Sequence, residues 1–228
     1  METSYKSLNR VFLLGLIFAI QATCQVACIK TSPAPTVTAS GSFLEMVNAS
    51  QISAPQDVYF AGVKTIFTLG YGQTSGFQSI TPGTYTVAFN ASSTTNVSAT
   101  ANLTFGPGYY TAYFTDDGSV LSVFEDRTAP QPGKARIGFV QISSAITTNP
   151  VDIYITGGSK IVSGLYDKTS SPYYDIDPAT TSFSLTVSGS STILLNMPVT
   201  LAANHLYTIY ISGVPSKPLD YHLLPEDL

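Results

Sequence analysis

The sequence has little charge, only two cysteines and no tryptophan. Cys24 and Cys28 both lie near the N-terminus, so no disulfide can form within the remainder of the chain. Charged residues make up 11% of the sequence, and the formal net charge is −4. The 10 Lys and Arg residues form no cluster. Nucleic-acid binding requires clustered cations to neutralise phosphates, so this class of partner is excluded.

Histidine is also scarce, which limits the catalytic arrangements available. The two histidines are His205, in a predicted turn, and His222, near the C-terminus. A Ser-His-Asp site stays open because serines are abundant, but no nucleophile-elbow pattern surrounds any of them. We therefore predict no catalytic residue and no cofactor.

Two acidic segments are candidate calcium ligands. Asp175 and Asp177 alternate along one predicted strand, and Asp116-Asp117-Gly118 resembles part of a calcium loop. Neither segment supplies the number of oxygen ligands that calcium requires, and aspartate is common in turns because it hydrogen-bonds nearby backbone. We predict solvated carboxylates and no metal.

The N-terminus contains the one long apolar run. Lys6 and Arg10 precede the uncharged segment Val11 to Ile20, which is typical of the core of a signal peptide. Spanning a bilayer takes about 20 apolar residues, so a leader over residues 1–27 is favoured over an uncleaved anchor through residues 11–27.

Both cysteines follow this run, which favours lipidation. Bacterial lipoprotein signals are cut after a small residue and before a lipid-carrying cysteine, and Cys28 follows Ala27. Cys24, which follows Thr23, is the second choice. A plain secretory leader or a Cys24–Cys28 bridge are the alternatives. The Pro-rich residues 28–41 then suit an extended tether.

A short strand pattern occurs twice in the rest of the chain. Asp57-Val58-Tyr59-Phe60 matches Asp152-Ile153-Tyr154-Ile155, and the neighbouring segments repeat in the same order. The repeat and the Pro-rich link before residue 133 divide the chain into domains over 42–132 and 133–228. Frequent Gly, Pro and Asn turns predict an all-β fold, namely two tandem antiparallel β-sandwiches of immunoglobulin or prealbumin type.

Strand signals recur at short intervals in both repeats. In one of them Tyr85, Val87 and Phe89 share a face that we expect to be buried, so that Tyr85→Ala would cost about 3–5 kcal/mol. Asp117-Gly118 predicts a tight hairpin. The predicted strands are 43–49, 57–60, 64–69, 76–80, 84–90, 97–104, 109–115, 119–125, 135–142, 151–155, 159–163, 172–176, 182–188, 193–199, 206–212 and 219–224.

Adjacent tyrosines raise the possibility of a carbohydrate platform. The pairs are Tyr109-Tyr110 and Tyr173-Tyr174. Because side chains alternate along a strand, one ring of each pair should face the core and the other should face water. Packing is favoured over ligand contact.

These segments together resemble the bacterial domain-of-unknown-function family DUF4397, in two tandem copies. The resemblance rests on Val47-Asn48-Ala49-Ser50, Asp57-Val58-Tyr59, Pro82-Gly83-Thr84-Tyr85-Thr86-Val87, Gly133 to Val140 and Val151-Asp152-Ile153-Tyr154. It implies a secreted or lipid-anchored envelope protein and carries over no catalytic position. The second copy has Ala179 where the family has Gly, and Asn204-His205 where it has Gly-Lys.

The sequence therefore predicts a non-catalytic, lipid-anchored cell-envelope protein that serves as a binding, adhesion or scaffold module. The expected location is the outer membrane, on its surface or periplasmic face. A glycan-binding accessory protein of a polysaccharide-uptake system and a hydrolase with an unrecognised site are the alternatives. The expected partners are the membrane, through the lipid, and a surface protein or glycan; the oligomeric state stays open.

Overall fold

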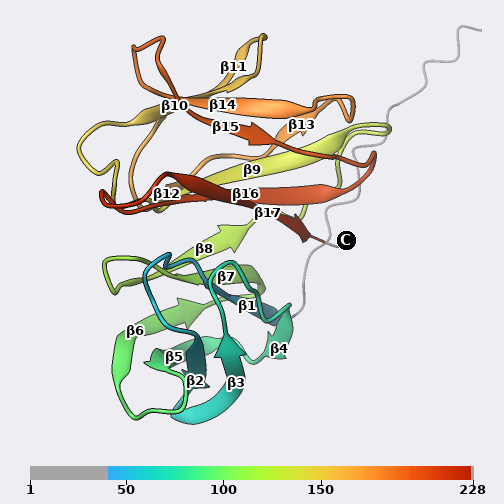
Figure 1. Cartoon of the computed structure of the whole chain (residues 1–228). Coiled ribbons are helices and arrows are strands. Elements are labelled where there is room, and N and C mark those ends of the chain that lie inside the picture. Colours follow the sequence, from blue (N-terminus) through green and yellow to red (C-terminus); the bar gives the residue numbers. More distant parts are fainter. Residues whose placement is uncertain (1–40, 227–228) are drawn as a thin grey trace, which may run out of the picture. The chain divides into compact units, whose positions relative to one another are not determined.

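The computed structural model describes residues 41–226, and it is built entirely from β-strands and connecting turns (Figure 1). No helix among these residues is long and apolar enough to cross a membrane. The strands are β1 Ser42–Asn48, β2 Gln56–Phe60, β3 Val63–Leu69, β4 Gln78–Ile80, β5 Gly83–Ala91, β6 Val97–Phe105, β7 Gly108–Phe114, β8 Val120–Glu125, β9 Ala135–Gln141, β10 Val151–Ile155, β11 Lys160–Leu165, β12 Thr169–Ser170, β13 Tyr174–Ile176, β14 Ser182–Val187, β15 Ile193–Pro198, β16 Leu206–Ser212 and β17 Asp220–Glu226.

Strands β1–β8 (the first half) and β9–β17 (the second half) have the same topology. In the first half the sheets run β4-β1-β7-β8 and β3-β2-β5-β6. In the second half they run β12-β9-β16-β17, with β13 also paired to β9, and β11-β10-β14-β15. We call the β1- and β9-containing sheets the inner sheets and the others the outer sheets. The predicted all-β sandwich fold is confirmed.

The expectation of purely antiparallel sheets is wrong at one pairing in each half. β1 pairs with β7 in parallel, and β9 pairs with β16 in parallel, while all other named strand pairs are antiparallel. Alternation along a strand does not reveal the direction of its neighbour, because the side-chain period is the same in both cases. The parallel pairs bring the start and the end of each half together.

The repeated aspartate holds an irregular edge strand in each half. Asp57 accepts hydrogen bonds from the Thr68 amide (2.9 Å) and Ser92 Oγ (2.8 Å), and Asp152 accepts them from the Gly164 amide (2.9 Å) and Ser188 Oγ (2.6 Å). Both β2–β3 and β10–β11 contain two register shifts at equivalent positions. The carboxylate therefore binds an amide that the shifted ladder leaves free.

A hydrophobic core fills each sandwich. In the first half Leu44 and Phe114 of the inner sheet pack with Val87 and Phe89 of the outer sheet. Tyr85 lies on the predicted face and packs against this core, but it is only half-buried and its hydroxyl donates to the Thr81 carbonyl. The face was assigned correctly. The expected cost of Tyr85→Ala is smaller than predicted, because folding removes less of the apolar surface of Tyr85 from water.

A third core joins the two inner sheets to each other. Tyr113 and Tyr210, which occupy equivalent positions opposite Val47 and Val140, meet edge to face at 5.5 Å between ring centroids. Both rings are fully buried. The inner sheets are thus covered on both faces, and the described residues belong to one compact unit.

The structure corrects the prediction that one ring of each adjacent tyrosine pair faces water. Tyr110 and Tyr174 pack against the sandwich cores as expected. Their neighbours were expected to face water, but Tyr173 donates a hydrogen bond to buried Glu125, and Tyr109 stacks on Phe43 at 4.6 Å. Tyr109 and Tyr173 thus lie against the inner sheets and contact other protein groups there.

Candidate functional site

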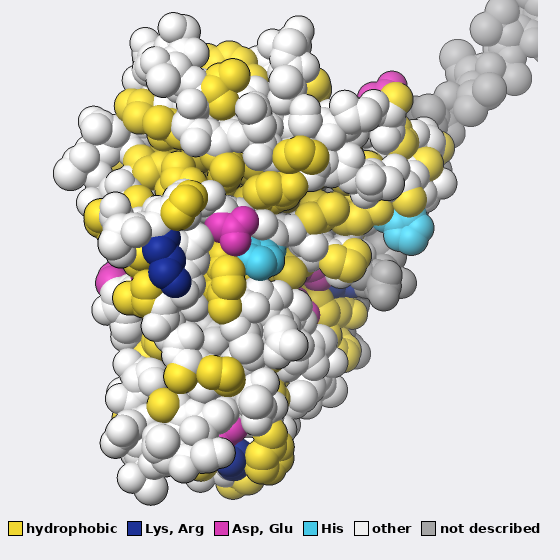
Figure 2. All heavy atoms as spheres, viewed as in Figure 1, with side chains coloured by type: hydrophobic (Ala, Val, Ile, Leu, Met, Phe, Trp, Pro, Cys, Tyr) yellow, Lys and Arg dark blue, Asp and Glu magenta, His cyan; other side chains and the backbone are white. Residues whose placement is uncertain are grey.

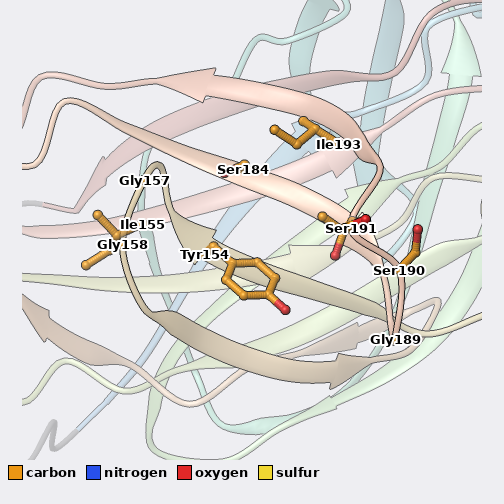
Figure 3. A pocket seen from close by; sticks show the side chains of 10 residues that line it. Tyr154, Ile155, Gly157, Gly158, Ser184, Gly189, Ser190, Ser191 and Ile193 are labelled. Atoms are coloured by element: carbon orange, nitrogen blue, oxygen red, sulfur yellow. The ribbon is translucent and has the colours of Figure 1, made fainter.

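A groove on the outer sheet of the second half is the candidate site. It has a volume of about 460 Å³ and lies between the β10–β11 hairpin and the β14–β15 turn (Figure 3). The residues that line it are Tyr154, Ile155, Gly157, Gly158, Ser184, Thr186, Gly189, Ser190, Ser191 and Ile193.

Strand register explains why these side chains meet. Tyr154 pairs with Ser184, and Asp152 pairs with Thr186, so all four project from the face of the sheet that points away from the core. Figure 3 shows the Tyr154 ring between the hairpin and the turn that carries Ser190 and Ser191. The groove thus has an aromatic wall, an apolar contribution from half-exposed Ile193 and a row of hydroxyl groups.

One of these hydroxyl groups is unusual. Thr186 is 4% exposed, and its Oγ1 atom is buried with no hydrogen-bond partner within the protein. Leaving a buried hydroxyl unpaired costs about 1–3 kcal/mol, so buried polar groups are nearly always paired. The floor of the groove therefore holds a polar atom whose hydrogen bond the protein does not supply.

The charges beside the groove neutralise each other. Lys160 Nζ lies 2.6 Å from Asp152 Oδ2 and 5.5 Å from the centroid of the Tyr154 ring. Burial opposes ionisation of Asp152, but the hydrogen bonds from Lys160, Ser188 and Gly164 lower its pKa to about 2. The groove is consequently close to neutral at physiological pH.

The structure does not assemble a Ser-His-acid site from the two histidines. His205 lies in the turn before β16 and is exposed, and its neighbour Asn204 adopts a positive φ of 65°. His222 stacks on Tyr210 at 4.9 Å, and burial lowers its pKa. The nearby Ser212 is fully buried and its hydroxyl is bonded to Tyr71 at 2.8 Å, so it is not placed as a nucleophile.

The acidic segments form hydrogen-bonded turns and ion pairs. Asp175 Oδ1 lies 3.7 Å from Arg136, and Asp177 Oδ2 lies 3.6 Å from Lys134. Asp117 accepts hydrogen bonds from Ser119 and is paired with Lys168, and Gly118 takes the positive φ expected of the hairpin. Among the described residues, no group of three or more potential ligands could hold a metal ion.

A cluster of three buried glutamates lies where the inner sheets meet, and sequence reasoning missed it. Glu45, Glu125 and Glu226 are at most 6% exposed, and burial raises the pKa of each, that of Glu226 to about 9. Arg127 donates to Glu226 at 3.1 Å. Glu125 and Arg127 stand at the start of the polar segment before residue 133, yet both are buried. A soluble substrate cannot reach these carboxylates, so we interpret the cluster as structural.

Cys24 and Cys28, the predicted lipidation residues, lie outside the described residues. Their role stays a prediction.

The Tyr154 groove was missed by sequence reasoning, because Tyr154 was recognised only as part of the repeat. The signal available was the alternation itself, which places Asp152 and Tyr154 on the outer face once Ile153 is assigned to the core.

Comparison with solved structures finds low similarity over most of the chain. A family 26 carbohydrate-binding module from Eubacterium rectale, in complex with maltoheptaose, is 16% identical, with 82% of this chain and 98% of that chain covered and a TM-score of 0.28. A family 41 module from streptococcal virulence factors is 10% identical, with coverages of 79% and 96% and a TM-score of 0.25. A protein described as a cell adhesion protein from Bacteroides fragilis is 10% identical, with coverages of 82% and 98% and a TM-score of 0.22. At these TM-scores the likenesses carry no argument about function.

No curated protein matches this chain in sequence. A family model does match: residues 42–148 fit the model described as Domain of unknown function (DUF4397). The match begins at β1 and ends between β9 and β10. A second family domain in the rest of the chain stays a prediction. The match supports the resemblance inferred from the sequence, and residues 42–148 are therefore similar to the DUF4397 family.

Proposed function

We propose that this protein is a non-catalytic binding module of the cell envelope and that the Tyr154 groove binds a carbohydrate chain. The observation that carries the proposal is the buried, unpaired Thr186 hydroxyl on the floor of a groove walled by an aromatic ring. Binding sites combine apolar walls with a few polar groups that fix the ligand's orientation. A carbohydrate offers both an apolar ring face and many hydroxyl groups.

The surroundings of the groove favour a neutral sugar. Lys160 is already paired with Asp152, so the groove has no free cation to bind an acidic sugar or a phosphate. Figure 2 shows few Lys and Arg side chains on the face of the molecule that it displays, and they do not gather into a patch. The chain's net charge of −4 would also repel polyanions at long range.

We further propose that a lipid on Cys28 holds the protein at the membrane. The support is the position of Cys28 after a signal-peptide core and a small residue. Each buried CH₂ of an acyl chain contributes about 0.8 kcal/mol, so two or more chains give stable attachment. The binding halves would then act at the envelope without entering the bilayer.

A glycan array probed with the protein tests the carbohydrate proposal. We expect binding to neutral oligosaccharides that Tyr154→Ala weakens, because the variant removes the stacking surface of this groove. The matched control is Tyr166→Ala, which removes a tyrosine that is 62% exposed and does not line the groove. Binding that Tyr154→Ala leaves unchanged, or no binding by the native chain, would contradict the proposal.

Cell fractionation tests the anchor. We expect Cys28→Ser to move the protein from the membrane fraction to the soluble fraction without changing its melting curve, because Cys28 precedes β1, the first strand that the structure describes. Release by Cys24→Ser alone would place the lipid on Cys24. Retention of the double variant in the membrane would show that the apolar segment itself is the anchor.

A further inference from the structure

The edge strands β3 and β11 are equivalent, yet they differ at two adjacent positions. Register aligns Leu69 with Leu165, and the amides of Thr68 and Gly164 both donate to the repeated aspartate. The first half therefore has Phe67-Thr68 where the second half has Ser163-Gly164. The rest of the arrangement is kept, including the lysine at Lys64 and Lys160 that pairs with the aspartate.

Thr68 adopts a backbone conformation that suits glycine. Its φ is 57°, and φ at the equivalent Gly164 is 69°. A β-branched residue in this left-handed region is a genuine outlier, because its Cβ crowds the backbone. Such strain tends to persist at sites where a side chain is needed for function. The second half shows that this fold accepts glycine here, so the fold itself does not require threonine.

Phe67 and Thr68 line a groove of about 600 Å³ in the first half. Residues 65–69 of β3 form one wall, and Gln73, Thr74 and Ser75 form the other. Thr74 makes an isolated bridge to Val47 of the inner sheet, so the groove lies at the open edge between the two sheets of this sandwich.

The exposed aromatic ring has an unusual setting. Phe67 is 68% exposed, so its ring is accessible to a ligand. Lys64 Nζ lies 4.4 Å from the centroid of its ring and holds one face by a cation–π contact. Thr65 and Thr68 line the same groove as this ring.

We propose that this groove is a second carbohydrate site, with Phe67 as the stacking platform and Thr68 as a hydrogen-bonding residue. The inference rests on the proposed function, because it extends the same ligand class to the other half. An extended peptide is a poorer occupant, because the two register shifts in β3 interrupt the backbone pattern that an added strand would need. One chain would then bind a long polysaccharide at two points and gain avidity.

Calorimetric stoichiometry on the full chain tests the second site. The polysaccharide is chosen by retardation in gels that contain soluble starch, xylan, galactomannan or laminarin, and its hexasaccharide is the titrant. We expect two sites on the native chain, one on Tyr154→Ala, one on Phe67→Ala and none on the double variant. Ser163→Ala, at the equivalent position of the second half, is the matched control and should retain two sites.

The outcomes separate the two proposals. One site that only Tyr154→Ala removes would overturn the second site and keep the Tyr154 groove. One site that only Phe67→Ala removes would overturn the Tyr154 groove and keep the second site. No retardation by any of the four polysaccharides would overturn both.

Thr68→Gly tests the role of the strained residue. We expect this variant to raise the melting temperature by about 2–4 °C, because glycine relieves the strain, and to weaken binding at the Phe67 site about tenfold or more. If the Thr68 side chain served only the fold, its removal would not raise the melting temperature and weaken binding at the same time. A lower melting temperature, or unchanged affinity, would refute the assignment of Thr68.

Discussion

Replacing Glu226 with glutamine tests the charge balance where the inner sheets meet. Three carboxylates, on Glu45, Glu125 and Glu226, share the single guanidinium of Arg127 within this cluster. Burial and the two neighbouring glutamates raise the pKa of Glu226 to about 9, and Arg127 offsets only part of this effect. Glu226 therefore holds its proton to a higher pH in the folded protein than in the unfolded chain.

The sign of the pH dependence follows from proton binding. The folded state holds this proton at pH values where the unfolded chain, with a carboxyl pKa of 4.5, has released it. Stability therefore falls as the pH rises from about 4.5 toward 9, by at most about 1.4 kcal/mol per pH unit for one carboxyl. At that limit the loss between pH 5 and pH 8 is at most about 4 kcal/mol.

Glutamine cannot ionise, so Glu226→Gln should flatten this slope and make the variant more stable than the native chain at pH 8. Urea unfolding at several pH values between 5 and 8 measures the slope of the unfolding free energy against pH for both proteins. Asp177→Asn is the control, because Asp177 is exposed and its side chain lies outside the cluster. A slope that is unchanged in Glu226→Gln would refute our account of the buried cluster.

Three further variants test the packing and the repeated aspartate. Phe89→Ala should cost about 3–5 kcal/mol in urea unfolding, and Tyr85→Ala only about 1–2 kcal/mol, because Tyr85 is half-buried; equal costs would contradict the assignment. Tyr113→Phe should leave stability unchanged or raise it by up to about 1 kcal/mol, because its buried hydroxyl has no partner; a loss above 1 kcal/mol would point to a hidden hydrogen bond. Asp152→Asn should lower the melting temperature at pH 7 and lower it much less near pH 2, because the lowered pKa stabilises the fold only while the carboxyl is ionised. An equal loss at both pH values would show that charge is not involved.

The sequence by itself determined the strands and their repetition. Alternation in segments such as 84–90 and the turn residues between them predict strands whose bounds agree with the structure to within about two residues at most ends. Among the strands that the structure describes, only β12 has no predicted counterpart, because its two residues are too few to show a period. The repeated aspartate was also visible, because it stands at the start of an otherwise apolar pattern.

Tertiary structure alone decided the groove and the buried charges. Tyr154, Ser184 and Thr186 come from strands that are distant in sequence, and only strand pairing brings them to one face. Glu125 and Arg127 look like a solvated link because their local sequence is polar, yet they are buried where the two inner sheets meet. Local sequence sets which side of a strand a residue occupies, but whether that side meets water, a ligand or another sheet depends on long-range packing.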